Sequence, residues 1–219
     1  MSHVRFELPP RARMTANNQK DPLPYYYKAS TGWLYRHRLQ MGLDLLPRGG
    51  ASVLEVGVGS GVLVPTLTRH YPRYVGTDLA LPAGLEALVA PGCQASFRTA
   101  DLLQEGALPK DTFDAIVCFS VLEHIRDSDA AARALAQSLA PGGTLITGYP
   151  MVSRLMTRAF EAIGYPGIDE DHVAAPVQIA RALSRVLRPA GRVAFPPRLP
   201  VQAALYQCTA WTRPEAPRT

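Results

Sequence analysis

From residue 51 onward, short apolar runs alternate with segments whose apolar residues recur at helical spacing. The apolar runs cover residues 53–57, 74–78, 96–100, 113–119 and 144–148, and the helical segments cover residues 62–70, 80–89 and 128–139. Strands that alternate with helices form parallel sheets with right-handed crossover connections. The pattern therefore predicts an α/β protein with a mostly parallel sheet and helices on both of its faces.

The segments that flank this pattern have a different periodicity. Residues 25–46 have apolar positions at helical spacing and end at Pro47, which predicts one or two helices, whereas the proline-rich and charged residues 1–24 predict a loose arm. Further helices are expected over residues 153–163 and 176–187, the second stopped by Pro189 and Gly191. Residues 192–195 and 203–212 predict two strands that complete the sheet. We therefore divide the chain into an N-terminal segment, residues 1–50, and a sheet domain, residues 51–219.

The composition fits one well-filled domain. Of the 219 residues, 47% are hydrophobic and 19% are charged, and the three cysteines lie far apart without C-x-x-C spacing. No apolar run approaches the roughly 20 residues of a membrane span, and the first residues lack a hydrophobic signal region. We therefore expect a cytoplasmic protein, a monomer or homodimer, with no membrane partner.

The formal net charge of +5 comes from the two flanks. Residues 51–150 hold 6 Lys and Arg against 10 Asp and Glu, whereas residues 1–50 hold 8 against 3 and residues 151–219 hold 9 against 5. Basic flanks beside a site favour an anionic ligand. Arginines such as Arg181 and Arg185 can equally lie on the solvent-exposed face of a helix. The charge alone therefore does not decide between an anionic ligand and an ordinary helix surface.

A glycine-rich turn joins the first predicted strand to the first predicted helix of the sheet domain. It reads Glu55-x-Gly57-x-Gly59-x-Gly61, and glycines allow positive φ angles and a close approach of the backbone to a ligand. A dinucleotide fingerprint would place its third small residue at Val62, whose branched side chain obstructs close helix packing. The spacing instead resembles the first motif of the class I S-adenosylmethionine-dependent methyltransferases.

Three later matches follow in that family's order. Asp78 ends the second strand about 20 residues after the turn, where a carboxylate can accept bonds from ribose hydroxyls, and Asp101 ends the third strand. The segments 113–124 and 139–146 resemble the fourth-strand motif and the turn into strand five. The resemblance covers residues 51–212 and implies a Rossmann-like sheet of seven strands with an antiparallel C-terminal strand and an N-terminal helical lid over residues 1–50.

The resemblance also assigns roles in binding S-adenosylmethionine. It implies that the glycine turn holds the methionine end, that Asp78 binds the ribose and that Asp101 binds the adenine. The full set of cofactor-binding residues that it predicts is Glu55, Gly57, Gly59, Gly61, Asp78, Leu79, Asp101, Leu102, Phe119 and Ser120.

Candidates for the chemistry at the methyl acceptor are fewer. His124 is our first candidate for the general base, because imidazole titrates near neutral pH and the residue follows the fourth strand. A histidine at a helix start can also be structural. Tyr26 belongs to an aromatic group (Tyr25, Tyr26, Tyr27, Trp33 and Tyr35) that either covers the cofactor or packs the helix onto the sheet.

Ser120-x-x-Glu123-His124 also resembles a Glu-x-x-Glu-His metal motif found in ubiquinone-pathway and small-RNA methyltransferases, with His172 as a further ligand. Ser120 replaces the first glutamate and removes one hard anionic oxygen, so we predict no metal and keep His172 as a catalytic candidate.

The sequence thus predicts transfer of a methyl group to an oxygen or nitrogen of a small molecule in a biosynthetic pathway. Phe119-Ser-Val-Leu stands where amine methylases of DNA and glutamine carry an Asp/Asn-Pro-Pro-aromatic motif, and no Pro-Cys nucleophile is present, which argues against two subclasses that act on macromolecules. Two alternatives remain. One is an RNA or tRNA methyltransferase, which the basic flanks favour, and the other is an S-adenosylmethionine-binding protein that is non-catalytic or catalyses a reaction other than methylation.

Overall fold

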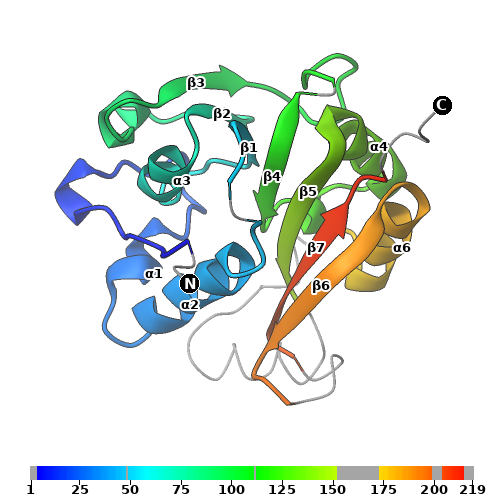
Figure 1. The fold of residues 1–219 in the computed structure, drawn as a ribbon. Helices are drawn as coiled ribbons and strands as arrows, with labels where there is room; N and C mark the ends of the chain where they lie inside the picture. The colour runs from blue at the N-terminus through cyan, green and yellow to red at the C-terminus, as the bar shows by residue number, and fades with distance from the viewer. Residues whose placement is uncertain (1–3, 48, 111, 152–172, 199–203, 215–219) are drawn as a thin grey trace.

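The computed structural model describes residues 4–47, 49–110, 112–151, 173–198 and 204–214. Its centre is a seven-stranded sheet in the order β3-β2-β1-β4-β5-β7-β6 (Figure 1). The strands are β1 (Ser52–Val56), β2 (Arg73–Asp78), β3 (Gln94–Thr99), β4 (Phe113–Phe119), β5 (Leu139–Pro150), β6 (Arg188–Phe195) and β7 (Tyr206–Thr212). Neighbouring strands from β3 to β5 pair in parallel, whereas β7 runs antiparallel to both β5 and β6. The predicted Rossmann-like α/β sheet is confirmed.

Helices cover both faces of the sheet (Figure 1). One face is covered by α1 (Leu23–Tyr27), α2 (Gly32–Leu43) and α3 (Val64–His70), and the other by α4 (Ser128–Ser138) and α6 (Pro176–Val186). Three short 3₁₀ turns complete the elements: η1 (Arg11–Arg13), η2 (Leu85–Leu88) and η3 (Leu122–His124).

The alternation of side chains along the central strands creates two hydrophobic cores. Val117 of β4 belongs to the core beneath α2 and α3, whereas its neighbour Ile116 belongs to the core beneath α4 and α6. Both side chains have an exposed fraction of 0%. Successive residues of a strand point to opposite faces, which is why the buried strands are apolar at nearly every position.

The N-terminal segment is not a loose arm in residues 4–24. Val4, Met14 and Leu23 are buried in the same core as α2 and α3. The backbone N–H groups of Phe6 and Glu7 donate to Gln40 Oε1 (2.8 Å) and Thr66 Oγ1 (3.0 Å). The apolar residues spaced along an otherwise polar segment anchor it to the sheet domain, and this is why the prediction fails.

One further prediction differs from the structure in its helix bounds. The helix expected over residues 80–89 is only η2, because Gly84 takes a φ of 89° and interrupts the helical backbone. The helix predicted over residues 176–187 is present as α6, and it ends before Pro189 and Gly191, which lie in the edge strand β6, where the pairing register shifts between them. The helix predicted over residues 153–163 lies outside the described residues.

Candidate functional site

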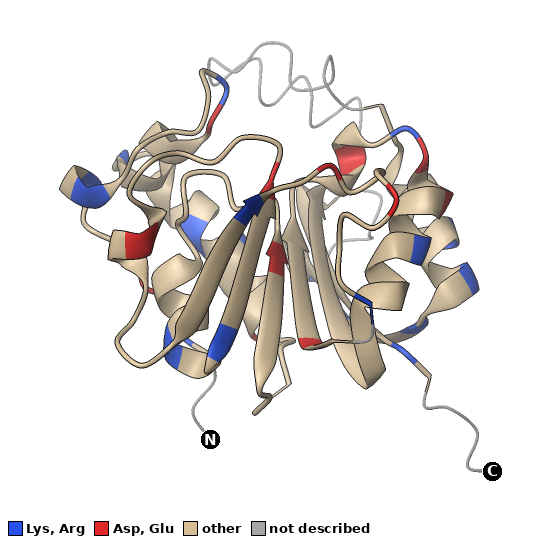
Figure 2. Cartoon of the chain, turned by 90° about the horizontal axis from the view of Figure 1, so that it is seen from above, with Lys and Arg blue, Asp and Glu red and all other residues tan. Residues whose placement is uncertain are grey.

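A cavity of about 1090 Å³ opens at the carboxyl ends of β1, β2 and β4. The carboxyl ends of neighbouring parallel strands meet at one edge of the sheet, and ligands of open α/β sheets bind in the crevice there. Acidic positions gather along this edge, whereas Lys and Arg lie mostly on the outer elements on either side of the sheet (Figure 2). The lining combines this edge with residues from the N-terminal segment, α1, α2 and η3.

The glycine turn after β1 forms one wall of the cavity. Gly57, Gly59 and Gly61 have φ angles of 83°, 53° and 83°, which side chains rarely tolerate. A Cβ atom on Gly57 would lie 2.2 Å from Val121 Cγ2, whereas one on Gly59 would meet nothing within 4 Å. Gly57 and Gly61 are therefore required by packing, and Gly59 leaves room for a ligand against the backbone.

Asp78 lies at the tip of β2 and is bonded to this turn. Its Oδ2 accepts from the Gly59 N–H at 2.7 Å, and its Oδ1 accepts from the Ala80 N–H at 3.3 Å. A carboxylate offers about four acceptor positions, so this side chain can still accept bonds from two hydroxyl groups. The adjoining Leu79 is 71% exposed and presents an apolar contact surface to the cavity.

Asp101 and Leu102 line the same end of the cavity. Asp101 Oδ1 accepts from the Leu103 N–H at 2.9 Å, which fixes the turn after β3, and Leu102 is buried beneath it. The structure thus brings together Asp78, Leu79, Asp101 and Leu102, the four residues that the sequence assigned to the nucleoside part of the cofactor.

Glu55 lies near the carboxyl end of β1, one of the central strands, and is buried, with an exposed fraction of 3%. The hydroxyl of Tyr74 donates to its Oε2 at 2.6 Å. Burial raises the pKa of Glu55 to about 8, against the opposing effect of the Tyr74 bond, and nearby Asp78 raises it further. A buried carboxyl group with few partners favours a cationic group beside it.

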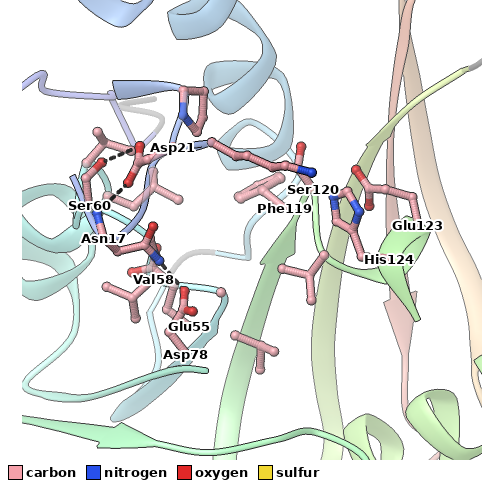
Figure 3. Close-up of a pocket in the computed structure, with 18 of the residues that line it drawn as sticks. Asn17, Asp21, Glu55, Val58, Ser60, Asp78, Phe119, Ser120, Glu123 and His124 are labelled. Carbon is pink, nitrogen blue, oxygen red and sulfur yellow. Dashed lines mark hydrogen bonds between the residues drawn. The ribbon is translucent and has the colours of Figure 1, made fainter. Parts of the chain in front are cut away.

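The opposite wall is formed by the segment after β4 (Figure 3). Ser120 has a φ of 55°, and its Oγ lies 3.2 Å from the Tyr206 hydroxyl. His124 is exposed and lines the cavity.

Glu123 is 3% exposed, and neither of its carboxyl oxygens has a hydrogen-bond partner among the described residues. Burial raises the pKa of Glu123 to about 8, whereas the charge of Arg38 lowers it.

Phe119 lies between three elements at the floor of the cavity. A Cβ atom on Gly42 of α2 would lie 2.3 Å from its ring, and one on Gly148 of β5 would lie 2.5 Å from it. The two glycines leave the space that the Phe119 ring occupies. The predicted cofactor-contacting residues Phe119 and Ser120 both line the cavity.

The N-terminal aromatics divide into two groups. Tyr25, Tyr26 and Tyr35 line the cavity; Tyr25 stacks on Tyr35 with ring centroids 5.5 Å apart. Trp33 and Tyr27 do not line it: Trp33 packs on Phe195 at 5.8 Å, and the Tyr27 hydroxyl donates to the Pro9 carbonyl at 2.6 Å. Of the two interpretations left open for this aromatic group, packing against other parts of the chain fits Trp33 and Tyr27, whereas the other three line the cavity.

The lining residues that were not predicted include three polar ones, Asp21, Arg38 and Tyr206. Asp21 is 8% exposed and accepts from the Asn17 N–H (3.0 Å), the Leu23 N–H (2.8 Å) and the Ser60 hydroxyl (3.3 Å), which ties the N-terminal segment to the glycine turn (Figure 3). An acid just before Pro22 at a helix start was a usable signal. Arg38 was recognisable only as a charge within an aromatic helix, and Tyr206 had no distinguishing pattern.

Within the part of the chain that the structure describes, no three His, Cys, Asp or Glu residues are grouped to hold a metal ion. His172, which we kept as a catalytic candidate, lies outside the described residues. Among the described helices, none has the length and apolar character needed to cross a membrane.

A family model described as a methyltransferase domain matches residues 33–192. The chain belongs to this family, which confirms the class predicted from its sequence. The matched range includes all of α2 but its first residue, the glycine turn, both strand-end acids and η3.

Curated relatives and solved structures agree with this assignment. The chain is 34% identical over 152 residues to the ubiquinone biosynthesis O-methyltransferase of Xylella fastidiosa (strain 9a5c), covering 61% of this chain and 60% of that protein. It is 36% identical over 112 residues to the enzyme of the same name from Xanthomonas axonopodis pv. citri (strain 306), covering 49% and 46%. The chain thus spans about half to three fifths of these relatives.

Solved structures show the same fold at lower identity. The N-methyltransferase NodS from Bradyrhizobium japonicum WM9, in complex with S-adenosyl-l-homocysteine, superposes with a TM-score of 0.62 at 20% identity, covering 91% of this chain and 95% of that one. The [4+2]-cyclase SpnF superposes with a TM-score of 0.63 at 15% identity, covering 92% and 87%. One fold thus holds different chemistries, so the function must be argued from the site.

Proposed function

We propose that this protein transfers the methyl group of S-adenosylmethionine to a hydroxyl oxygen of a small molecule. The observation that carries the proposal is one continuous cavity with a glycine turn and strand-end acids on one wall and His124 on the other. A cofactor on the first wall and an acceptor on the second would meet between them.

The residues present fit S-adenosylmethionine. The open backbone at Gly59 would hold its methionyl chain, the oxygens of Asp78 would hold its ribose hydroxyls, and Leu79 and Leu102 would hold its adenine. The buried carboxyl group of Glu55 suits the cationic amino group of the same molecule. When bound, the cofactor supplies an electrophilic methyl group.

The chain's own part in the reaction is positioning and proton removal. The floor at Phe119 and the tyrosines at the mouth exclude water and hold the acceptor close to the methyl group, and such positioning supplies much of the rate of a displacement reaction. His124 accepts the hydroxyl proton, and Tyr26 orients the acceptor. An oxygen acceptor is supported by the two relatives, both named O-methyltransferases.

Calorimetric titration and product analysis together test this proposal. S-adenosylmethionine and S-adenosylhomocysteine are expected to bind, and NAD is not. A panel of phenols, alcohols and amines is then screened for S-adenosylhomocysteine formation, with phenols or alcohols expected to react. Binding of NAD in place of S-adenosylmethionine would refute the cofactor assignment, and cofactor binding without product on any acceptor would favour a binding protein.

The variant His124→Ala tests directly whether His124 acts as the general base. It is expected to lower kcat by about 10²-fold or more and to remove an ascending limb of the pH–rate profile, while cofactor affinity stays near wild type. His70→Ala, an exposed histidine at the end of α3 and outside the cavity, is the control. An unchanged pH profile for His124→Ala would assign this histidine a structural role.

A further inference from the structure

Two aspartates hold the tip of the glycine turn from two sides (Figure 3). Asp78 of β2 accepts from the Gly59 N–H at 2.7 Å, and Asp21 of the N-terminal segment accepts from the Ser60 hydroxyl at 3.3 Å. Ser60 is 5% exposed and Asp21 is 8% exposed. Glycine gives a backbone wide conformational freedom, so the position of this turn depends on such bonds.

The Asp21 side chain also holds the segment around it. Its Oδ2 accepts from the Asn17 N–H at 3.0 Å, and its Oδ1 accepts from the N–H of the fully buried Leu23 at 2.8 Å. Asn17 in turn donates from Nδ2 to the Ala80 carbonyl, in the loop after β2, at 3.4 Å. Asp21 therefore connects the buried start of α1 to both the glycine turn and the loop after β2.

The bonds of Asp21 fit a link between segments better than a direct contact to a ligand. A carboxyl group offers about four acceptor positions, and the chain itself already uses three of them. Residues 15–20 are exposed apart from Asn17, which is half-buried, and Asp21 is buried. The surrounding protein thus covers the two residues of this stretch that reach the loops.

This link comes from outside the range that the methyltransferase family model matches. Asn17 and Asp21 precede residues 33–192, whereas Ser60 and Ala80 lie within them. Asn17, Asp21 and Ser60 all line the cavity. The N-terminal segment of this chain therefore joins two loops of the matched domain at the side of the cavity assigned to the cofactor.

We propose that Asp21 is a positioning residue for cofactor binding. Through Ser60 it fixes the glycine turn, and through Asn17 it fixes the loop after β2, so both loops are in place before the cofactor arrives. Without the link, the loops must be ordered when the cofactor binds, which lowers its affinity. This inference rests on the proposed function, because it takes S-adenosylmethionine as the ligand of this wall.

Calorimetry with two ligands tests the two branches of the link on the complete chain. Ser60→Ala is expected to weaken S-adenosylhomocysteine binding about fivefold or more, but that of methylthioadenosine, which lacks the amino-acid portion, by less than about twofold. Asn17→Ala is expected to weaken both ligands alike. Asp44→Ala, an exposed acid at the end of α2 and outside the cavity, is the control and is expected to bind both like the wild type.

A double variant separates positioning from a direct contact of Ser60 with the cofactor. If Asp21 acts through Ser60, the Asp21→Ala/Ser60→Ala protein is expected to bind S-adenosylhomocysteine as tightly as Asp21→Ala alone, within about twofold. Losses that multiply would overturn the proposal, as would an equal loss for both ligands in Ser60→Ala.

Hydrogen exchange on the cofactor-free protein measures the link itself, and Ser60→Ala suffices for it should Asp21→Ala not fold. The N–H groups of Gly57 and Val58 are bonded to the Thr77 carbonyl, so their exchange reports opening of the turn. Exchange over residues 57–61 is expected to be faster in Ser60→Ala than in the wild type and in Asp44→Ala, and unchanged exchange would overturn the proposal. A wild type that binds no S-adenosylhomocysteine would refute the proposed function, whereas exchange in the turn would still score the link.

Discussion

At the scale of single residues, the site depends on carboxyl groups whose surroundings differ. Asp78 is partly exposed and bonded to backbone N–H groups, whereas Glu55 and Glu123 are buried, one with a single tyrosine bond and the other with no partner among the described residues. The first environment leaves carboxyl oxygens of Asp78 open to hydroxyl groups of a ligand. The second favours the neutral form, so these acids are expected to respond to pH and to cationic ligands.

Asp78→Asn tests the role of the charged acceptor. The amide oxygen can still accept from the Gly59 N–H, but the charge that strengthens bonds to the ribose hydroxyls is lost. Charge-assisted bonds contribute roughly 1.5–3 kcal/mol each, so affinity for S-adenosylmethionine is expected to fall at least about tenfold. Calorimetry measures it, with Asp129→Asn in the surface ion pair to Arg185 as the control. Unchanged affinity would mean that the ribose is held elsewhere.

Glu55 gives the cofactor-free protein a pH-dependent stability. Its pKa is raised to about 8 in the folded protein, so between about pH 5 and pH 8 the folded state binds more protons than the unfolded state. The free energy of unfolding should therefore fall as pH rises through this range, by up to about 1.4 kcal/mol per pH unit for each such group. Urea unfolding at several pH values measures the slope.

Glu55→Gln should reduce that slope but not abolish it, because Glu123 contributes with the same sign. Glu86→Gln, an exposed acid in η2, should leave it unchanged. A slope that persists undiminished in Glu55→Gln would show that this carboxyl group is already charged at neutral pH.

At the scale of elements, α2 is part of the site as well as part of the core. Gly42 lets α2 approach β4 so closely that its backbone packs on the Phe119 ring, and Arg38 lies one turn earlier on the same helix. Any shift of α2 away from β4 would therefore move the cavity floor and the Arg38 side chain in the cavity wall together.

Gly42→Ala tests this coupling. The added Cβ would lie 2.3 Å from the Phe119 ring, and overpacking of a core typically costs about 1–3 kcal/mol. Stability and cofactor affinity are both expected to fall. Gly191→Ala is the control, because its Cβ would meet nothing closer than Leu45 Cδ2 at 3.4 Å. A loss of stability with cofactor affinity unchanged would separate α2 from the site.

The elements of the sheet were predictable because their signals are local. The strand runs, the E-x-G-x-G-x-G turn and the strand-end acids are each contained in a few consecutive residues. The family resemblance that these motifs carry implied ten cofactor-contacting residues, of which all but Gly61 line the cavity. Arg38 and Tyr206 were missed because their proximity is created by the pairing of β7 with β5 and the packing of α2. Such contacts between distant segments leave no local pattern.

At the scale of the whole molecule, the N-terminal segment and the sheet share one hydrophobic core. Leu23 and Tyr26 of α1 and Leu39 and Leu43 of α2 are buried together with Val117 and Ile146 of the central strands. The division at residue 50 remains a prediction from the sequence, and this shared core makes us expect a single cooperative unit. A lid that opens by separating α1 and α2 from the sheet would expose the whole of that core.

Unfolding experiments on the complete chain and on a shortened one test this unity. Leu23→Ala should lower the free energy of unfolding by about 2–5 kcal/mol in a single transition, because the side chain is fully buried and its loss leaves a cavity. Val177→Ala, 68% exposed on α6, should change it by less than about 0.5 kcal/mol. Deletion of residues 1–46 should abolish cooperative unfolding, since one face of β1, β4 and β5 would lose its cover. A truncated protein that still unfolds cooperatively and binds S-adenosylmethionine would establish residues 1–50 as a separable lid.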